Sequence, residues 1–164
     1  MTRTVLLLLS LVMLALPAAA TAGGFDRGAV RIDLGVARGR AFDQDYTIYG
    51  LGAGYYVADG IEVGLDYSAW RGDGPDIDQY SPSIRLVLRA GGFRPYLGAF
   101  YRATRVDGVE DSDAWGGRAG FYMAAGRGAH WGVGVAYLRY LDCDEAVYGS
   151  CSETYPEFSL VFHL

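Results

Sequence analysis

The stretch that decides the fold closes the chain: Glu157-Phe158-Ser159-Leu160-Val161-Phe162-His163-Leu164. Apolar and polar residues alternate along it, with Val161 as the one exception. A period of two predicts a strand with one face on an apolar surrounding and the other on a polar one. Because most domains fray at their ends, large apolar residues at a terminus favour a closed barrel, whose last strand must be ordered throughout.

The same alternation recurs upstream and predicts seven further strands. Their apolar faces run over Val30–Val36, Tyr49–Val57, Ile61–Ala69, Ile84–Leu88, Leu97–Tyr101, Trp115–Met123 and Trp131–Tyr137. Asp59-Gly60 lies between the second and third strands and predicts a tight hairpin turn, because Asp-Gly accepts positive φ at little cost. The pattern therefore predicts an all-β fold, an eight-stranded antiparallel up-and-down barrel.

The predicted connections alternate in length. Short ones are expected near residues 58–60, 90–94 and 125–130, and longer polar ones near 39–45, 70–81, 105–114 and 141–153. Alternating short turns and long loops are typical of transmembrane barrels, whose short turns face the periplasm.

Aromatic residues at outward positions cluster near the strand ends and predict two girdles at the membrane interfaces. They are Tyr49, Tyr67, Tyr101, Trp115 and Tyr137 on the loop side, and Tyr55, Trp131 and Phe162 on the turn side. A soluble lipocalin-like barrel would share the period of two but reverse its faces. The girdles, the ordered end and the loop lengths together favour a transmembrane barrel.

The amino terminus has the features of a secretory signal peptide. A short basic start is followed by an apolar run from Val5 to Leu16 and by Ala20-x-Ala22. The run is shorter than the roughly 20 residues that a spanning helix needs. We therefore expect residues 1–22 to be a signal peptide and residues 23–164 to form the exported barrel domain.

The chain resembles the small eight-stranded outer-membrane barrels of the OmpA and OmpX type. The likeness lies in the signal end, in Arg94-Pro95-Tyr96-Leu97-Gly98-Ala99 and in the last strand, and covers nearly all of residues 23–164. It implies a bacterial outer-membrane location with membrane lipid and lipopolysaccharide as neighbours. It also implies an assembly signal, read by the outer-membrane assembly machinery, at Phe158, Leu160, Phe162 and Leu164. Such signals usually end in Phe, whereas this chain ends in Leu164.

Charged residues at inward positions are the main candidate site. They are Arg31, Asp33, Glu62, Asp66, Arg85, Arg89, Arg102, Arg118 and Glu157. An eight-stranded barrel is only wide enough for side chains to fill, so we expect these charges to pair with one another. An ion path is the alternative interpretation, but the barrel size favours a packed polar plug. Inward glycines would leave room for the long arginines.

Cys143 and Cys151 both lie in the last predicted loop. An even cysteine count in an exported chain favours a disulfide over free thiols. Two cysteines without a nearby histidine make a poor zinc site, so no metal or cofactor is expected.

Catalysis is not expected from the available residues. A lipid A-modifying hydrolase would need serine, histidine and a carboxylate together where an acyl chain can reach them. His130 and His163 are the only histidines, and both are predicted at the periplasmic end, away from lipopolysaccharide. The net charge of −5 argues against a nucleic-acid partner.

The predicted loops are rich in carboxylates. These are Asp43, Asp45, Asp73, Asp76, Asp78, Asp107, Glu110, Asp111, Asp113, Asp142, Asp144, Glu145 and Glu153. Solvated surface loops are the favoured interpretation. Divalent cations bridging to lipopolysaccharide phosphates, or a basic extracellular partner, are the alternatives. The sequence leaves a structural role and an adhesive role equally open.

Overall fold

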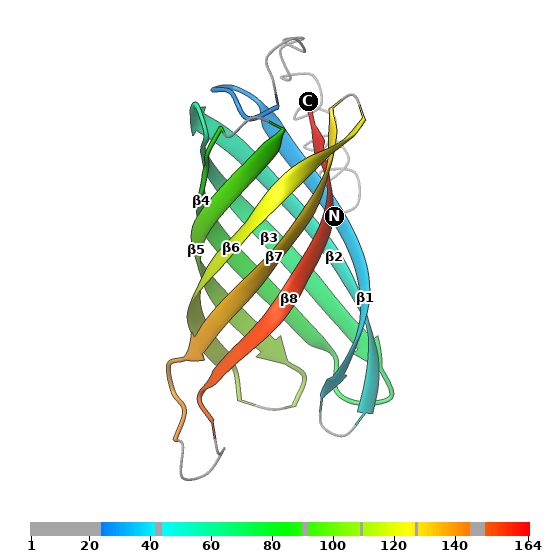
Figure 1. Ribbon diagram of the computed structural model, residues 1–164. Coiled ribbons are helices and arrows are strands. Elements are labelled where there is room, and N and C mark those ends of the chain that lie inside the picture. Colours follow the sequence, from blue (N-terminus) through cyan, green and yellow to red (C-terminus); the bar gives the residue numbers. More distant parts are fainter. Residues whose placement is uncertain (1–23, 42–43, 90–91, 109, 127, 145–149) are drawn as a thin grey trace, which may run out of the picture.

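The computed structural model describes residues 24–41, 44–89, 92–108, 110–126, 128–144 and 150–164. Eight antiparallel strands follow one another around a closed barrel, and β8 returns to β1 (Figure 1). The strands are β1 (Val30–Ala41), β2 (Gln44–Ala58), β3 (Ile61–Gly72), β4 (Ile77–Val87), β5 (Phe93–Val106), β6 (Ser112–Gly126), β7 (Ala129–Tyr140) and β8 (Ser152–His163). The predicted eight-stranded antiparallel barrel is confirmed, while the predicted signal peptide lies outside the described residues.

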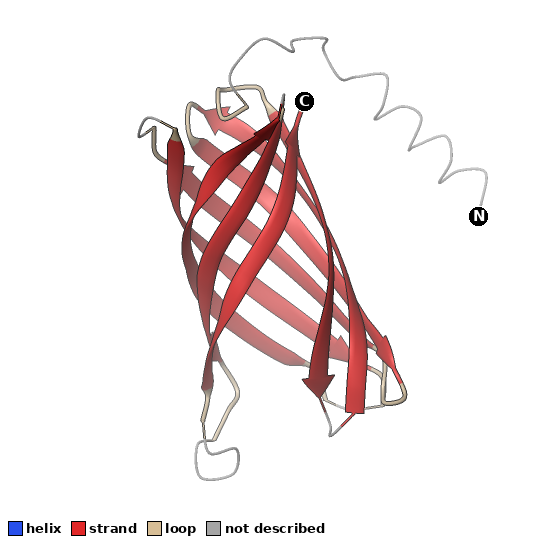
Figure 2. Cartoon of the chain, turned by 45° about the vertical axis from the view of Figure 1, so that its right-hand side comes forward, coloured by secondary structure: helices blue, strands red, loops and turns tan. Residues whose placement is uncertain are grey.

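The two faces of the wall differ as the alternation predicts. Outward side chains such as Leu34, Leu97 and Trp131 are exposed, whereas inward ones such as Arg31 and Tyr122 are buried. In the described part of the chain, no helix is long and apolar enough to span a membrane (Figure 2).

One end of the barrel, which we call the turn end, carries the tight turns and the carboxyl terminus (Figure 1). Gly60 adopts a φ of +74° in the predicted Asp59-Gly60 turn, a conformation that favours glycine. A Cβ at Gly60 would also overlap the carbonyl oxygen of Val87. Gly128 has a φ of +70° in the turn between β6 and β7. The turn predicted at residues 58–60 is therefore confirmed.

The opposite end, which we call the loop end, departs from the prediction. β1 and β2 are separated only by residues 42–43, and residues 73–76 and 107–111 join the next two strand pairs. Only the connection 141–151 is long. The predicted alternation in connection length is therefore wrong.

The difference arises because strand pairing continues beyond the apolar part of the wall. Arg40 still pairs with Asp45, and Thr104 with Ser112, in the antiparallel register. Strands therefore reach 15 residues in β2 and β6, beyond the alternating stretches Tyr49–Val57 and Trp115–Met123 that predicted them. Backbone hydrogen bonds do not require apolar side chains, so alternation disappears from the sequence before the strand ends.

The junction between β1 and β8 is unlike the others. Its register covers only Arg31–Leu34 against Leu160–His163, although both strands continue toward the loop end. By contrast, β1 pairs with β2 along its whole length, from Val30 to Ala41. In Figure 1, β8 (red) and β1 (blue) separate toward the loop end. We call this unpaired stretch, residues 35–41 of β1 and 152–159 of β8, the seam.

Candidate functional site

Seven of the predicted inward charges form one connected set of ion pairs inside the barrel. We call them the interior charge network: Arg31, Asp33, Glu62, Asp66, Arg85, Arg118 and Glu157. They come from five strands, β1, β3, β4, β6 and β8. Strand alternation places each of them on the inner face, and barrel closure brings them together.

Arg31 is the centre of this network. Its Nε donates to Glu62 Oε1 at 2.9 Å and its Nη2 donates to Asp66 Oδ1 at 3.1 Å. Its Nη1 pairs with Asp33. Only 1% of Arg31 is exposed. One buried guanidinium thus neutralises carboxylates from two strands, which makes it the most highly connected charge of the interior.

Arg85 extends the network toward the turn end. Its Nη1 lies 3.8 Å from Glu62 Oε2 and donates to the hydroxyl of Tyr122. The guanidinium carbon lies 5.2 Å from the centre of the Tyr96 ring. A buried cation is therefore compensated by one carboxylate, one hydroxyl and an aromatic face.

Arg118 extends the network toward β8. Its Nη1 donates to Asp66 Oδ2 at 3.1 Å, and its Nη2 lies 3.8 Å from Glu157 Oε1. The guanidinium carbon lies 4.5 Å from the centre of the Phe100 ring. Asp66 thus joins Arg31 to Arg118 across the lumen.

Arg102 lies inside the barrel but binds neutral groups. It donates to the Tyr155 hydroxyl at 2.6 Å and to Ser81 Oγ at 3.3 Å. The ring of Phe100 lies 5.2 Å away. The prediction that this arginine pairs with a carboxylate is wrong within the described residues, because the inward neighbours at its height carry hydroxyls and aromatic rings.

Arg89 does not belong to the interior. Its side chain is 55% exposed and pairs with Asp26, in the segment before β1 at the turn end. β4 ends at Val87, so strand alternation no longer fixes the direction of a side chain two residues later. The inward placement predicted for Arg89 is therefore wrong.

Small inward residues make room for the charges, as predicted. A Cβ at Gly54 would lie 2.6 Å from Glu62 Oε1, and one at Gly52 would lie 2.5 Å from the Asp33 carboxylate. At Gly64 an added Cβ would lie 3.1 Å from the guanidinium of Arg31. In the Gly50-x-Gly52-x-Gly54 stretch, Gly52 and Gly54 thus provide space that the network fills.

Periodicity did not predict the aromatic side chain that packs inside the turn end, Phe25, which we call the stopper. Phe25 precedes β1 and is 3% exposed. Its ring centre lies 4.5 Å from that of His163, 4.9 Å from that of His130 and 5.5 Å from that of Tyr122. Phe25 lies in no alternating segment, so periodicity could not identify it. Its only signal was an isolated Phe between glycines and charged residues.

Backbone contacts hold this stopper in place. The Gly60 N–H donates to the Phe25 carbonyl at 2.8 Å, and the Arg27 N–H donates to Asp59 Oδ1 at 2.9 Å. The Asp26–Arg89 pair adds an ionic contact. The segment before β1 is therefore anchored to the turns that surround it.

The two histidines meet at the turn end, where the sequence placed them. Their ring centres lie 5.1 Å apart. Both pack against Phe25, at the opposite end of the barrel from the loop 141–151. Among the residues that the structure describes, no group of three or more His, Cys, Asp or Glu is arranged to hold a metal ion.

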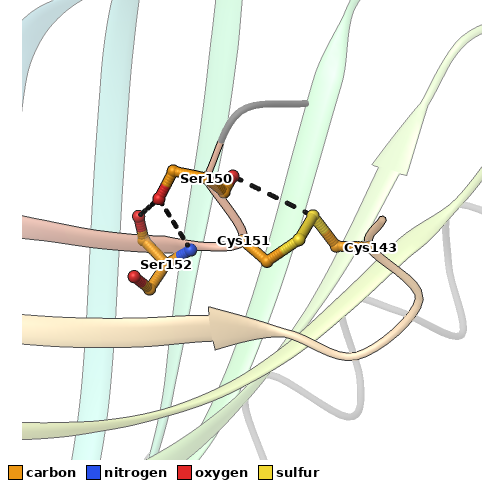
Figure 3. Close-up of a disulfide and its surroundings, with 4 residues drawn as sticks. All are labelled: Cys143, Ser150, Cys151 and Ser152. Carbon is orange, nitrogen blue, oxygen red and sulfur yellow. Dashed lines mark hydrogen bonds between the residues drawn. A yellow bond between two sulfur atoms is a disulfide. The ribbon is translucent and has the colours of Figure 1, made fainter. Parts of the chain in front are cut away.

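The predicted disulfide between Cys143 and Cys151 is present, with the Cα atoms 5.6 Å apart (Figure 3). Beside it, Ser150 Oγ donates to the Ser152 carbonyl at 3.0 Å. The Tyr140 N–H donates to the Cys151 carbonyl at 3.0 Å, which joins the loop to β7. The bond therefore closes the base of the connection 141–151.

Part of the acidic set is neutralised on the outer surface at the loop end. Arg71 lies 2.8 Å from Asp78 Oδ1 and 3.3 Å from Asp76 Oδ2. Arg105 lies 3.3 Å from both Asp111 Oδ2 and Asp113 Oδ1. These carboxylates belong partly to strands rather than to free loops. Asp43 and Glu145 lie outside the described residues.

Comparison with known proteins identifies the fold alone. No family model and no curated protein matches the chain. Among solved structures, the N-terminal β-barrel domain of Pseudomonas aeruginosa OprF matches with a TM-score of 0.66 at 15% identity, covering 84% of this chain and 98% of that one. OprG of P. aeruginosa matches with a TM-score of 0.55 at 16% identity, covering 86% and 98%. Neisserial surface protein A matches with a TM-score of 0.53 at 19% identity, covering 83% and 95%.

Proposed function

Because the chain has the fold of the small eight-stranded outer-membrane β-barrels, we propose that it is a non-catalytic integral protein of the bacterial outer membrane. Residues 1–22 direct its export, and its lumen is closed to solutes. Its role is structural or adhesive, with the loop end facing the outside of the cell. Membrane lipid and lipopolysaccharide surround the wall.

Support for a membrane location comes from the outer surface. Exposed apolar side chains form its middle, with aromatic residues near both ends, among them Tyr49 and Trp115 at the loop end and Tyr55 and Trp131 at the turn end. Aromatic girdles at the two interfaces are typical of outer-membrane barrels. A soluble lipocalin-like barrel is disfavoured, because it would expose this whole apolar surface to water.

The packing of the interior is the main observation that supports a closed lumen. Phe25 packs against Tyr56 and Tyr122 at the turn end, and the interior charge network follows it. A second apolar cluster contains Phe100 and Leu138. Buried aromatic rings on either side of a paired charge network support a plug rather than a pore.

A lipid A-modifying enzyme is the runner-up. It is disfavoured because both histidines pack against Phe25 at the turn end, while lipopolysaccharide would surround the loop end.

The last strand supports the role of an assembly signal. Phe158, Phe162 and Leu164 are exposed on its outer face, where assembly machinery reaches them.

The proposal is tested by two measurements, one of membrane insertion and one of ion conductance. Unheated protein from the membrane fraction should migrate differently from heated protein on a detergent gel, because a folded barrel resists detergent. The same protein in a planar bilayer should give no conductance steps. Reproducible steps that respond to Arg118→Met would overturn the closed lumen, and unchanged mobility after heating would overturn the membrane barrel.

A further inference from the structure

The seam leaves two strand edges without a partner. Continuing the register beyond Leu34 and Leu160 would place Gly35 opposite Ser159 and Val36 opposite Phe158. In the described residues no pair is formed at these positions. Unpaired N–H and C=O groups at the depth of the hydrocarbon are costly unless something hydrogen-bonds to them. In a membrane the seam therefore needs an occupant.

Pro156 is adapted to such an edge. It lies within β8 opposite Val135 of β7, and continuing the β1 register would place it opposite Arg38. Proline lacks an N–H and is confined within sheets to edges and irregular positions. A proline at this height therefore suits an edge that remains unpaired on the β1 side.

Apolar side chains border the seam on the outer face of the barrel. Val36 on β1 and Phe158 on β8 are each 74% exposed. On the opposite, inward face between them, a Cβ at Gly35 would have no neighbour within 4 Å. An acyl chain fits this surface, since it would cover both side chains.

The inner side of the seam is polar. The side chains of Asp33 on β1 and Glu157 on β8 are 19% and 21% exposed, whereas that of Glu62 on β3 is fully buried. An occupant with hydroxyl or amide groups next to its acyl chain could donate to these carboxylates and bond the free strand edges. The chemistry points to an amphiphile rather than to a hydrocarbon.

Two exposed arginines lie near the loop end of the seam, Arg38 on β1 and Arg139 on β7, the neighbour of β8. Arg38 lies one outward position beyond Val36, which pairs with Tyr49 of the aromatic girdle. Arg139 pairs with Trp115, another girdle residue, and with Ser152 of β8. Girdle aromatics mark the membrane interface, where lipid phosphates lie.

Other outward arginines differ from this pair. Arg71 and Arg105 are already held by aspartates of the neighbouring strands. Neither Arg38 nor Arg139 forms an ion pair with any residue that the structure describes. Both therefore remain available to an anionic headgroup.

We propose that the seam binds one outer-leaflet lipid with a phosphate headgroup. Arg38 on β1 and Arg139 on β7 bind the phosphate groups of the lipid from the two sides of β8, the acyl chain lies against Val36 and Phe158, and polar groups of the linkage region bond the free edges. This inference rests on the proposed outer-membrane location with the loop end outside.

The first test is native mass spectrometry of the purified barrel with diphosphoryl lipid A, with dephosphorylated lipid A, and with inorganic phosphate as competitor. Wild type should bind one diphosphoryl lipid A in preference to the dephosphorylated form. The double variant Arg38→Gln/Arg139→Gln should bind it about tenfold or more weakly, because each interfacial arginine adds roughly one factor of five. The matched control Arg71→Gln/Arg105→Gln should retain binding.

Several outcomes would overturn the proposal. Equal binding of the two lipid A forms would mean that phosphate is not recognised. An equal loss of lipid A binding in both double variants would mean that surface arginines attract the lipid without a specific site. Full displacement of lipid A by inorganic phosphate would mean that the acyl chain contributes nothing to binding.

Amide hydrogen exchange tests the seam itself. In detergent without lipid A, amides of residues 35–39 and 153–159 that point into the seam should exchange quickly, while those of residues 31–34 stay protected. Diphosphoryl lipid A should slow the former in wild type but not in Arg38→Gln/Arg139→Gln. If these amides were protected without lipid in a monomer, the two strand edges would be hydrogen-bonded to each other. If they were protected in a dimer detected by mass, a second copy of the chain would fill the seam. Heat-modifiable mobility of every variant separates these failures from failure of the membrane barrel.

Discussion

At the turn end, β1 and β8 are hydrogen-bonded and Phe25 packs among the inward rings; at the loop end the same two strands separate and a disulfide closes the neighbouring loop. The turn end is held by packing and backbone hydrogen bonds that connect distant parts of the chain. The loop end is held by a covalent bond between residues 8 apart in sequence. Resistance to unfolding should therefore depend more on the turn end than on the loop end.

The largest expected effect tests the charges beside the paired part of β1. Arg31→Met would leave Asp33, Glu62 and Asp66 without their shared cation. We expect the free energy of unfolding to fall by about 3–5 kcal/mol, measured by urea titration of the refolded barrel.

Arg102→Met is the matched control, because its hydrogen-bond partners are neutral hydroxyls. We expect it to lower the free energy of unfolding by about 1–2 kcal/mol. Equal losses in the two variants would show that arginine packing, rather than charge pairing, stabilises the interior.

The second prediction removes the stopper. Phe25→Ala should lower the free energy of unfolding by about 3–4 kcal/mol, because it empties a buried aromatic site. Phe93→Ala is the control at the same end, since Phe93 is exposed on the outer wall. A comparable loss at Phe93 would mean that the turn end has no special role in stability.

The third prediction tests the inside and outside faces where β8 pairs with both neighbours. Leu160 lies opposite Leu34 and Trp131 on the outer face. Leu160→Arg would put a charge on the lipid-facing side, between the turn-end girdle and the middle of the membrane, and should cost about 2–3 kcal/mol. Ser159→Arg, on the inner face beside the seam, should be better tolerated in outer-membrane fractionation. The reverse order is what a soluble barrel predicts.

The smallest expected effect belongs to the loop end. Cys143→Ser/Cys151→Ser should lower the free energy of unfolding by about 2 kcal/mol, because a short loop gains little from closure. Heat-modifiable mobility should persist in this variant. Its disappearance would show that the disulfide holds the barrel and not only the loop.

The sequence by itself determined the fold and most of the inward charges. A period of two assigned faces to every strand, so Arg31, Glu62 and Arg118 could be placed inside without coordinates. Asp59-Gly60 fixed a turn through backbone sterics, and the cysteine count predicted the disulfide. These features depend on local geometry and composition, which the sequence carries directly.

Only the tertiary structure decided which charges meet, where strands end and how the barrel closes. Arg89 leaves the interior because β4 stops at Val87, and Phe25 enters it although no periodic pattern includes it. The seam depends on how far β1 and β8 pair across the length of the chain. The pairing of strands and side chains at these positions follows from the geometry of closing a sheet on itself. That geometry depends on all eight strands together, so no single stretch of sequence contains it.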